Sequence, residues 1–182
     1  MALHYQQDEA KRTVLDAAYQ IANAARTAPK ARGIDHLIIA VADAEELRPI
    51  AKTMLRMHEE GNAPEFFARD AQNLMASQAM VVIGTKIKTL GLDCGLCGMD
   101  TCAQKNKYTA IPCVFNTNDL GIAIGSAASR AADLRLDNRV MYSAGVAAKE
   151  MKLLGEEAAV IFCLPLAVAS KSPFFDRKAA VK

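Results

Sequence analysis

The sequence contains no tryptophan, and Phe, Tyr and Trp together make up only 5% of its 182 residues. It also lacks a long apolar stretch. Its longest apolar run, residues 158–169, holds about a dozen residues, whereas a membrane-spanning helix needs about 20. The polar start, residues 1–9, lacks the apolar segment of a signal peptide. We therefore expect no membrane partner and a cytoplasmic location.

An excess of charge of one sign is also missing. The chain has 22 Lys and Arg residues against 20 Asp and Glu residues, a net charge of +2. This charge is too small to favour binding to nucleic acid, so we predict no nucleic-acid partner. Four lysines lie near the cysteines, and we interpret them as a solvated loop, with a docking face for an acidic partner as the alternative. They are Lys86, Lys88, Lys105 and Lys107.

Common catalytic motifs are absent as well: there is no GxGxxG, no P-loop, no HExxH and no GxSxG. His4, His36 and His58 have no metal-ligand spacing to one another or to the cysteines. The five cysteines are an odd number, and four of them are closely spaced. In a reducing compartment this pattern predicts metal or redox chemistry rather than structural disulfides.

Apolar residues account for 52% of the chain and charged residues for 23%, a balance typical of globular proteins. The length suits one hydrophobic core, so we predict a single domain over residues 1–182. Helical spacing of apolar residues and continuous apolar runs define the expected elements. Helices are expected over 8–27, 43–60, 64–75, 119–134 and 137–154, and strands over 36–41, 79–84 and 158–169.

Helices that alternate with continuous apolar strands predict an α/β (α+β) fold, in which a central sheet is buried between helical layers. Asp43 is expected to cap the second helix, and Gly61 to end it. The helix expected over 119–134 is rich in small residues, including Ala123 and Gly125. Such a face allows close approach, so we predict a homodimer interface there, with close packing inside one chain as the alternative.

The segment 89–118 has no sustained periodicity and holds four of the five cysteines. A loop of that length in a compact domain is usually functional or disordered. Cys94, Cys97, Cys102 and Cys113 follow the spacing C-x2-C-x4-C-x10-C. Thiolates favour zinc, copper(I) or iron–sulfur clusters. We therefore predict a metal-binding, Cys-rich loop inserted in the domain, with these four residues as ligands.

The spacing also bears on which metal binds. Structural zinc sites usually pair two knuckles across a longer gap, whereas here three cysteines fall within nine residues and the fourth stands alone. We therefore favour an iron–sulfur cluster, and 4Fe–4S over 2Fe–2S. A structural zinc site and a thiol switch formed by Cys94 and Cys97 are the alternatives. Gly95 and Gly98 allow tight turns after these cysteines, and Cys163 is interpreted as a buried core thiol.

Four stretches of the chain carry a resemblance to a known family. They are Asp-Cys-Gly-Leu-Cys-Gly-Met-Asp-Thr-Cys at 93–102, Leu-Gly-Ile-Ala-Ile-Gly-Ser-Ala-Ala at 120–128, Asp-Asn-Arg-Val-Met-Tyr-Ser-Ala-Gly at 137–145 and Lys-Ser-Pro-Phe-Phe-Asp-Arg at 171–177. Together they resemble the bacterial and archaeal proteins described as containing a ferredoxin domain. The resemblance implies a cluster protein of unknown physiological reaction. From the cysteines we predict an iron–sulfur redox protein that passes electrons to a redox partner protein, to a small-molecule acceptor or to a flavin in the same dimer.

Residues 24–33, Ala-Ala-Arg-Thr-Ala-Pro-Lys-Ala-Arg-Gly, resemble the Ala-Ala-Arg-x-Ala-Pro-Ser turn of the FMN-dependent nitroreductases. This likeness implies a helix-flanked sheet, a homodimer with FMN at its interface and a flavin-linked oxidoreductase. It would place Arg26, Pro29, Lys30 and Arg32 near the flavin, and Lys171 and Arg177 at its phosphate. The chain departs from that family at Lys30, which replaces the Ser of the turn, and no Arg-Arg-Ser-type motif precedes the first helix. For Arg26 and Arg32, a helix-end cation is the alternative interpretation.

Overall fold

A four-stranded antiparallel sheet forms the centre of the protein in the computed structural model, which describes residues 3–175. Its strands lie in the order β1-β2-β4-β3, and each pairs with its neighbour in the antiparallel sense. The strands are β1 (Leu37–Asp43), β2 (Ala79–Thr85), β3 (Asp137–Asn138) and β4 (Val160–Ala167).

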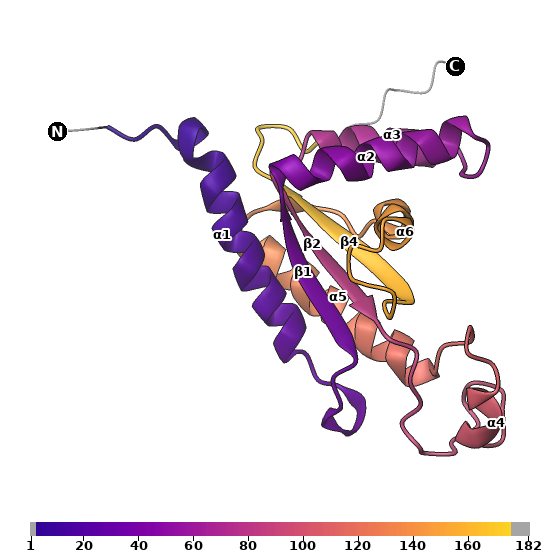
Figure 1. Cartoon of the computed structure of the whole chain (residues 1–182). Coiled ribbons are helices and arrows are strands. Elements are labelled where there is room, and N and C mark those ends of the chain that lie inside the picture. The colour runs from indigo at the N-terminus through magenta and orange to yellow at the C-terminus, as the bar shows by residue number, and fades with distance from the viewer. Residues whose placement is uncertain (1–2, 176–182) are drawn as a thin grey trace, which may run out of the picture.

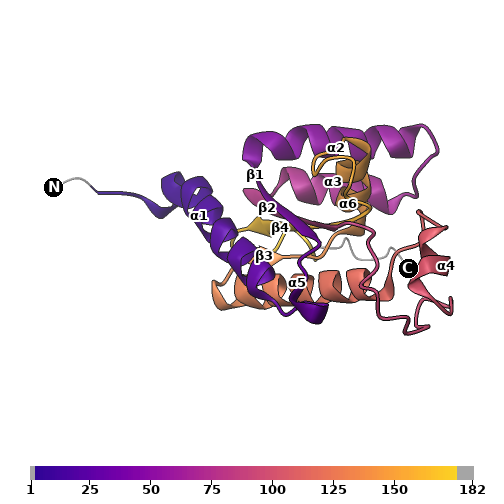
Figure 2. The same cartoon turned by 60° about the horizontal axis from the view of Figure 1, so that its bottom comes forward.

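Helices cover both faces of the sheet, as the two views in Figures 1 and 2 show. Helices α1 and α5 pack on one face, and α2, α3 and α6 pack on the other. None of the helices within residues 3–175 is long and apolar enough to cross a membrane. Their bounds are α1 (Gln6–Thr27), α2 (Ala44–Glu59), α3 (Phe66–Met75), α4 (Cys102–Asn106), α5 (Val114–Asp133) and α6 (Tyr142–Glu150), with a 3-10 turn, η1 (Ala31–Gly33), after α1.

Strand β2 is buried along its whole length, as its continuous apolar sequence predicts. Met80 and Val82 face the layer of α2, α3 and α6, whereas Val81 and Ile83 face α1 and α5, because successive side chains of a strand point to opposite faces. The same expectation is wrong for β1. This strand is at the edge of the sheet, and Ala40 in its middle is exposed.

Pro165 lies inside β4, a strand with neighbours on both sides, although proline cannot donate to a ladder. Cys163 exchanges both backbone hydrogen bonds with Met141, on the side of the sheet where β3 lies. Because hydrogen-bonding direction alternates along a strand, residue 165 faces the same side. On that side, Cys163 pairs with Met141, and β3 pairs only with Leu166 and Ala167. Pro165, which lacks an N–H, lies between these two pairings. The ladder between β2 and β4 is therefore kept.

Helix α6 lies directly against β4. An added Cβ at Gly145 would collide with the carbonyl oxygen of Ile161 and would lie 3.1 Å from the Cα of Phe162. Ala144, Ala147 and Ala148 flank this contact and are fully buried. The small residues of α6 thus serve close packing within the chain, and at Gly145 the backbone of β4 leaves no room for a Cβ.

A buried carboxylate links α3 to the start of α6. Asp70 is only 3% exposed, and its oxygens accept hydrogen bonds from Arg69 at 2.8 Å, from Arg139 at 3.2 Å and from the hydroxyl of Ser143 at 2.7 Å. A buried charge is tolerated when it is paired and hydrogen-bonded in this way. We infer that the network holds the connection before α6 against α3.

Several boundaries differ from the sequence-based expectations. Helix α5 begins at Val114, so the predicted loop 89–118 is wrong over its last five residues. Residues 137–138 form β3 instead of the start of a helix, which begins at Tyr142. The cap of α2 is confirmed, since the carboxylate of Asp43 accepts from the backbone N–H groups of residues 45 and 46 at 2.9 and 3.2 Å.

Candidate metal centre

The Cys-rich segment, residues 86–113, leaves the sheet after β2 and returns at the first turn of α5. Figures 1 and 2 both show α4 and its flanking loops projecting beyond the end of the sheet, next to the N-terminal end of α5. Helix α4 forms within this segment because Thr101 caps it, accepting from the N–H of Gln104 at 3.1 Å. Cys94, Cys97 and Cys102 therefore lie outside the two helical layers, and Cys113 lies at the start of α5.

Tight turns follow the first two cysteines, as the sequence predicts. Gly95 and Gly98 have φ values of 71° and 81°, in the left-handed region that favours glycine. The N–H of Gly98 donates to the carbonyl oxygen of Gly95 at 2.9 Å, which closes a turn over residues 95–98 that contains Cys97. The chain thus changes direction after each of these two thiols.

All four predicted ligands are free thiols, but they differ in burial. Cys94 is exposed, Cys97 and Cys102 are half-buried, and Cys113 is buried at 6% exposure, where it forms the N-cap of α5. The N–H of Cys102 donates to the carboxylate of Asp93 at 2.6 Å. Within residues 3–175, no three His, Cys, Asp or Glu side chains are close enough together to hold a metal ion. The four thiols therefore lie on one stretch of the chain but are not brought together around one point. Their role as ligands stays a prediction.

Lys105 contradicts the interpretation of the nearby lysines as a solvated loop. Its side chain is only 2% exposed, although Lys107 on the same segment is exposed. The other positions behave as surface residues: Lys88 is exposed, and Lys86 forms an ion pair with Glu157.

Polar contacts anchor the start of the Cys-rich segment to α5 and to η1. The side-chain oxygen of Asn116, which is 1% exposed, accepts from the N–H of Lys88 at 2.9 Å. Its NH₂ group then faces Nδ1 of His36 at 3.1 Å, so that ring nitrogen is assigned as the acceptor. The guanidinium of Arg32 donates to the carbonyl oxygen of Leu90. No sequence pattern pointed to Asn116, because its partners lie far away along the chain.

The cations predicted near a flavin bind acceptors of their own chain. Arg26 forms an ion pair with Asp35 at 2.6 Å, and Lys30 donates to the carbonyl oxygens of Arg26 and Ala28 at the end of α1. Burial raises the pKa of Asp35, but the hydrogen bonds from Arg26 and the N–H of Leu37, with the nearby positive charge, bring that pKa below its usual value. Of the remaining flavin residues, Pro29 and Lys171 are exposed, Arg32 contacts the Cys-rich segment, and Arg177 lies outside the described residues.

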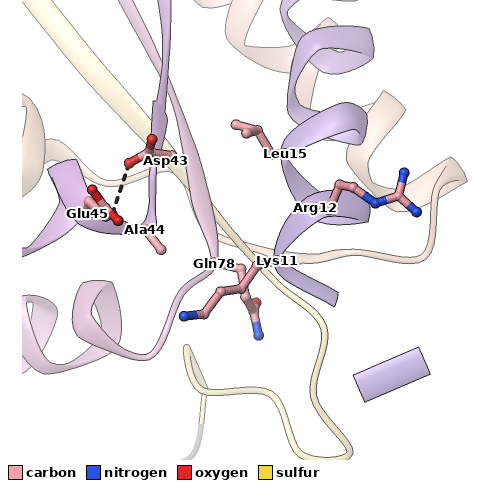
Figure 3. A pocket seen from close by; sticks show the side chains of 7 residues that line it. All are labelled: Lys11, Arg12, Leu15, Asp43, Ala44, Glu45 and Gln78. Carbon is pink, nitrogen blue, oxygen red and sulfur yellow. Dashed lines mark hydrogen bonds between the residues drawn. The ribbon is translucent and has the colours of Figure 1, made fainter. Parts of the chain in front are cut away.

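A separate hollow of about 290 Å³ lies between the first half of α1 and the junction of β1 with α2 (Figure 3). Asp43 at the end of β1 pairs with Ala79 at the start of β2, so this hollow is at the opposite end of the sheet from the Cys-rich segment. The carboxylate of Asp43, which lines the hollow, already caps α2. The hollow is therefore not part of the candidate metal centre. Its lining residues are Lys11, Arg12, Leu15, Asp43, Ala44, Glu45 and Gln78.

The thiols are expected to differ in reactivity. Cys163 is 1% exposed, and burial raises the pKa of its thiol well above the usual value, so it has little reactive thiolate. Metal-free, reduced protein treated with iodoacetamide should be modified first at Cys94, then at Cys97 and Cys102, and at Cys163 only after unfolding. Peptide mass spectrometry over time measures this order. Native labelling of Cys163 as fast as that of Cys94 would contradict the burial shown here.

The chain belongs to a family of uncharacterized proteins, which is described as containing a ferredoxin domain. A family model described as "Uncharacterized protein containing a ferredoxin domain" (DUF2148) matches residues 109–177. An "Uncharacterized protein" from Archaeoglobus fulgidus is 40% identical over 169 residues, which cover 88% of this chain and 90% of that protein. The predicted family is thereby confirmed. The matched residues 109–177 include Cys113 but not Cys94, Cys97 or Cys102.

Solved structures share the fold. A nitroreductase family protein from Clostridium novyi superposes with a TM-score of 0.58 at 15% identity, covering 84% of this chain and 73% of its own. A nitroreductase with bound FMN from Desulfitobacterium hafniense gives a TM-score of 0.57 at 18% identity, covering 86% and 78%. The prediction of a helix-flanked sheet of the nitroreductase type is confirmed, and at these identities the likeness establishes the fold alone.

Proposed function

We propose that the protein is an iron–sulfur redox protein in which Cys94, Cys97, Cys102 and Cys113 hold the cluster. The observation that carries the proposal is the set of four free thiols at the spacing C-x2-C-x4-C-x10-C within residues 94–113. A family whose description names a ferredoxin domain supports a redox role. The spacing of the cysteines favours a 4Fe–4S cluster, and a reducing cytoplasm would keep its thiols free.

The donor types on this segment suit such a group. Four thiols supply the soft ligands that iron–sulfur clusters need, and when bound the cluster supplies one-electron transfer. The positive φ of Gly95 and Gly98 lets the chain wrap tightly around a ligand set. The carboxylate of Asp93 accepts from the N–H of Cys102 at the start of α4, and Asn116 ties the start of the segment to α5.

We further propose a homodimer that uses the outer face of α5. Gly121, Ile122, Gly125 and Ser129 are exposed on this face, and none of them is charged. An uncharged, exposed helix face with small residues allows a second helix to approach closely. Gel filtration with light scattering should give twice the mass of the chain.

FMN is the proposed electron partner within the dimer. A structural neighbour is described as a nitroreductase with bound FMN, and the turn that resembles that family contacts the Cys-rich segment through Arg32 and Leu90. A flavin held by this turn would therefore lie close to the cluster, and the protein would be a flavin-linked oxidoreductase. Without flavin it would pass electrons to a partner protein or a small-molecule acceptor.

A structural zinc site is the second proposal. Residues 91–96 are all exposed, so this part of the segment has few apolar contacts to stabilise it. A structural metal supplies folding free energy directly. One zinc atom bound by the same four cysteines would then hold the segment together without redox chemistry.

Reconstitution distinguishes these proposals. Metal-free protein is incubated anaerobically with ferrous iron and sulfide, or with zinc, and in each case with added FMN. The cluster proposal predicts uptake of about four iron and four sulfide per chain, bleaching of visible absorbance by dithionite and recovery of absorbance in air. Uptake of one zinc with no uptake of iron and sulfide would overturn it. Absence of FMN from the gel-filtered protein would overturn only the flavin proposal.

A further inference from the structure

We propose that His36 is part of a pH-sensitive latch on the Cys-rich segment, and that protonation of its ring releases the start of this segment from α5. The latch consists of three groups: the ring of His36, the side chain of Asn116 on α5 and the backbone N–H of Lys88. The proposal does not rest on the proposed function, because none of these groups is a predicted metal ligand.

The direction of both hydrogen bonds in the latch follows from the backbone. A backbone N–H only donates, so the N–H of Lys88 requires the side-chain oxygen of Asn116 as its acceptor, at 2.9 Å. The NH₂ group of Asn116 is then the end that lies 3.1 Å from Nδ1 of His36. An NH₂ group also only donates, so Nδ1 must carry a lone pair. His36 is therefore neutral in the closed latch, with its proton on Nε2.

A second proton on the ring cannot be accommodated without the loss of a hydrogen bond, because both nitrogens of a charged imidazole are donors. If Asn116 keeps its orientation, two donors face each other. If its amide group turns over, its oxygen accepts from His36, and the N–H of Lys88 loses its acceptor. Asn116 is 1% exposed, and buried polar groups without partners are costly. The latch is therefore closed when His36 is neutral, and it opens as the pH falls.

The other charged and titratable groups around this junction do not reverse that direction. Histidine ordinarily changes its charge between about pH 5 and pH 8, whereas carboxylates, lysine, arginine and thiols ordinarily keep their state over most of that range. A carboxylate bound to the ring would favour its charged form, but within residues 3–175 no carboxylate forms an ion pair with His36. The groups concerned are Arg26, Asp35, Lys86, Lys88, Cys113, Asp119 and Glu157.

Opening of the latch is expected to be local. The N–H of Lys86 donates to the carbonyl oxygen of His36 at 3.1 Å, a backbone contact that does not involve the ring. On the other side of Lys88, the guanidinium of Arg32 donates to the carbonyl oxygen of Leu90. Release of Lys88 thus frees the few residues between these two anchors, where the chain leaves the sheet towards its thiols. Strand β2 stays paired.

Hydrogen exchange followed by NMR tests the latch at the N–H of Lys88 in the reduced full chain. The intrinsic rate at each pH divided by the measured rate gives a protection factor. We expect this factor to fall about fivefold from about pH 7.5 to about pH 5.5, the effect of losing one hydrogen bond. The N–H of Ile83, which lies in the middle of β2 between two strands, should keep its protection. Ring nitrogen shifts of His36 at the higher pH should show the proton on Nε2.

Three variants separate the latch from general effects of pH. His36→Asn places a side-chain oxygen near the position of Nδ1, where it accepts from Asn116 at every pH, so the protection of Lys88 should not depend on pH. Asn116→Asp supplies a carboxylate that accepts both from Lys88 and from the charged ring, so this protection should be kept or rise as the pH falls. His58→Asn removes a histidine whose ring contacts Ala63 instead, and it should behave like the parent.

The same pH dependence of Lys88 in His36→Asn as in the parent overturns the proposal. A parent protection factor that is unchanged from about pH 7.5 to about pH 5.5, or a neutral His36 with its proton on Nδ1, does so as well. If the buried carboxylate of Asn116→Asp prevents folding, the comparison of His36→Asn with His58→Asn decides alone. Metal content enters none of these measurements, so failure of the latch is distinguishable from failure of the proposed function.

Discussion

Replacing any one of Cys94, Cys97, Cys102 or Cys113 by serine should remove most of the iron and sulfide that the chain takes up on reconstitution. A hydroxyl is a poor ligand for iron in a cluster compared with a thiolate, and each cysteine is expected to bind one iron. We predict at least a severalfold loss of iron and sulfide per chain, measured colorimetrically on gel-filtered protein, with a matching loss of visible absorbance.

Two features of the structure separate this effect from unfolding. Cys113 is the N-cap of α5 but its side chain makes no capping hydrogen bond, and serine is a preferred N-cap residue, so Cys113→Ser should keep or strengthen the helix start. Cys163→Ala is the matched control, because Cys163 is buried between Val82 of β2 and Met141 and is not an expected ligand. Full metal uptake by one of the four serine variants would remove that residue from the ligand set, and loss of metal in Cys163→Ala would contradict the assignment.

Gly145→Ala should destabilise the metal-free protein strongly. The added Cβ would collide with the backbone of β4 at Ile161, and a backbone, unlike a flexible side chain, cannot move aside without shifting α6 or the sheet. Overpacking of a well-packed core costs about 1–3 kcal/mol and occasionally more, and a clash with backbone falls at the upper end. Urea unfolding followed by circular dichroism should therefore show a loss of about 3 kcal/mol.

Gly125→Ala is the control for this prediction. Gly125 is also in a helix, but an added Cβ meets nothing within 4 Å in the isolated chain, and alanine favours a helix over glycine by about 1 kcal/mol. A stability change of similar size and sign in both variants would contradict the close approach of α6 and β4. A Gly125→Ala variant that loses both stability and dimer mass would instead place α5 in the proposed dimer interface.

Much of the fold follows from patterns that are visible in the sequence. The run that became β2 is apolar at nearly every position, which is the signature of a strand covered on both faces. Helix α2 begins where Asp43 can cap it, as predicted. Short elements were missed because they carry no periodicity: α4 has five residues and β3 has two. The start of α5 was missed because Thr117 and Asn118 in its first turns are exposed and polar.

The candidate site was predictable only where its signal is local. Cysteine spacing and the glycines that follow Cys94 and Cys97 are contiguous in sequence, and the glycines have the expected conformation. The contact between His36 and Asn116 joins residues 80 positions apart, so it has no local signature. The burial of Lys105 also depends on how the segment folds back, and composition alone assigns lysine to the surface.

The central claim is that the four cysteines hold an iron–sulfur cluster, and purification of the intact chain under strict exclusion of oxygen tests it most directly. The purified protein is analysed for iron, sulfide, zinc and flavin, and its absorbance is recorded from about 300 to 700 nm, where cluster charge-transfer bands lie. We predict a brown protein with broad absorbance near 400 nm and equal amounts of iron and sulfide. A colourless protein that carries one zinc per chain, without iron or sulfide, would contradict the account.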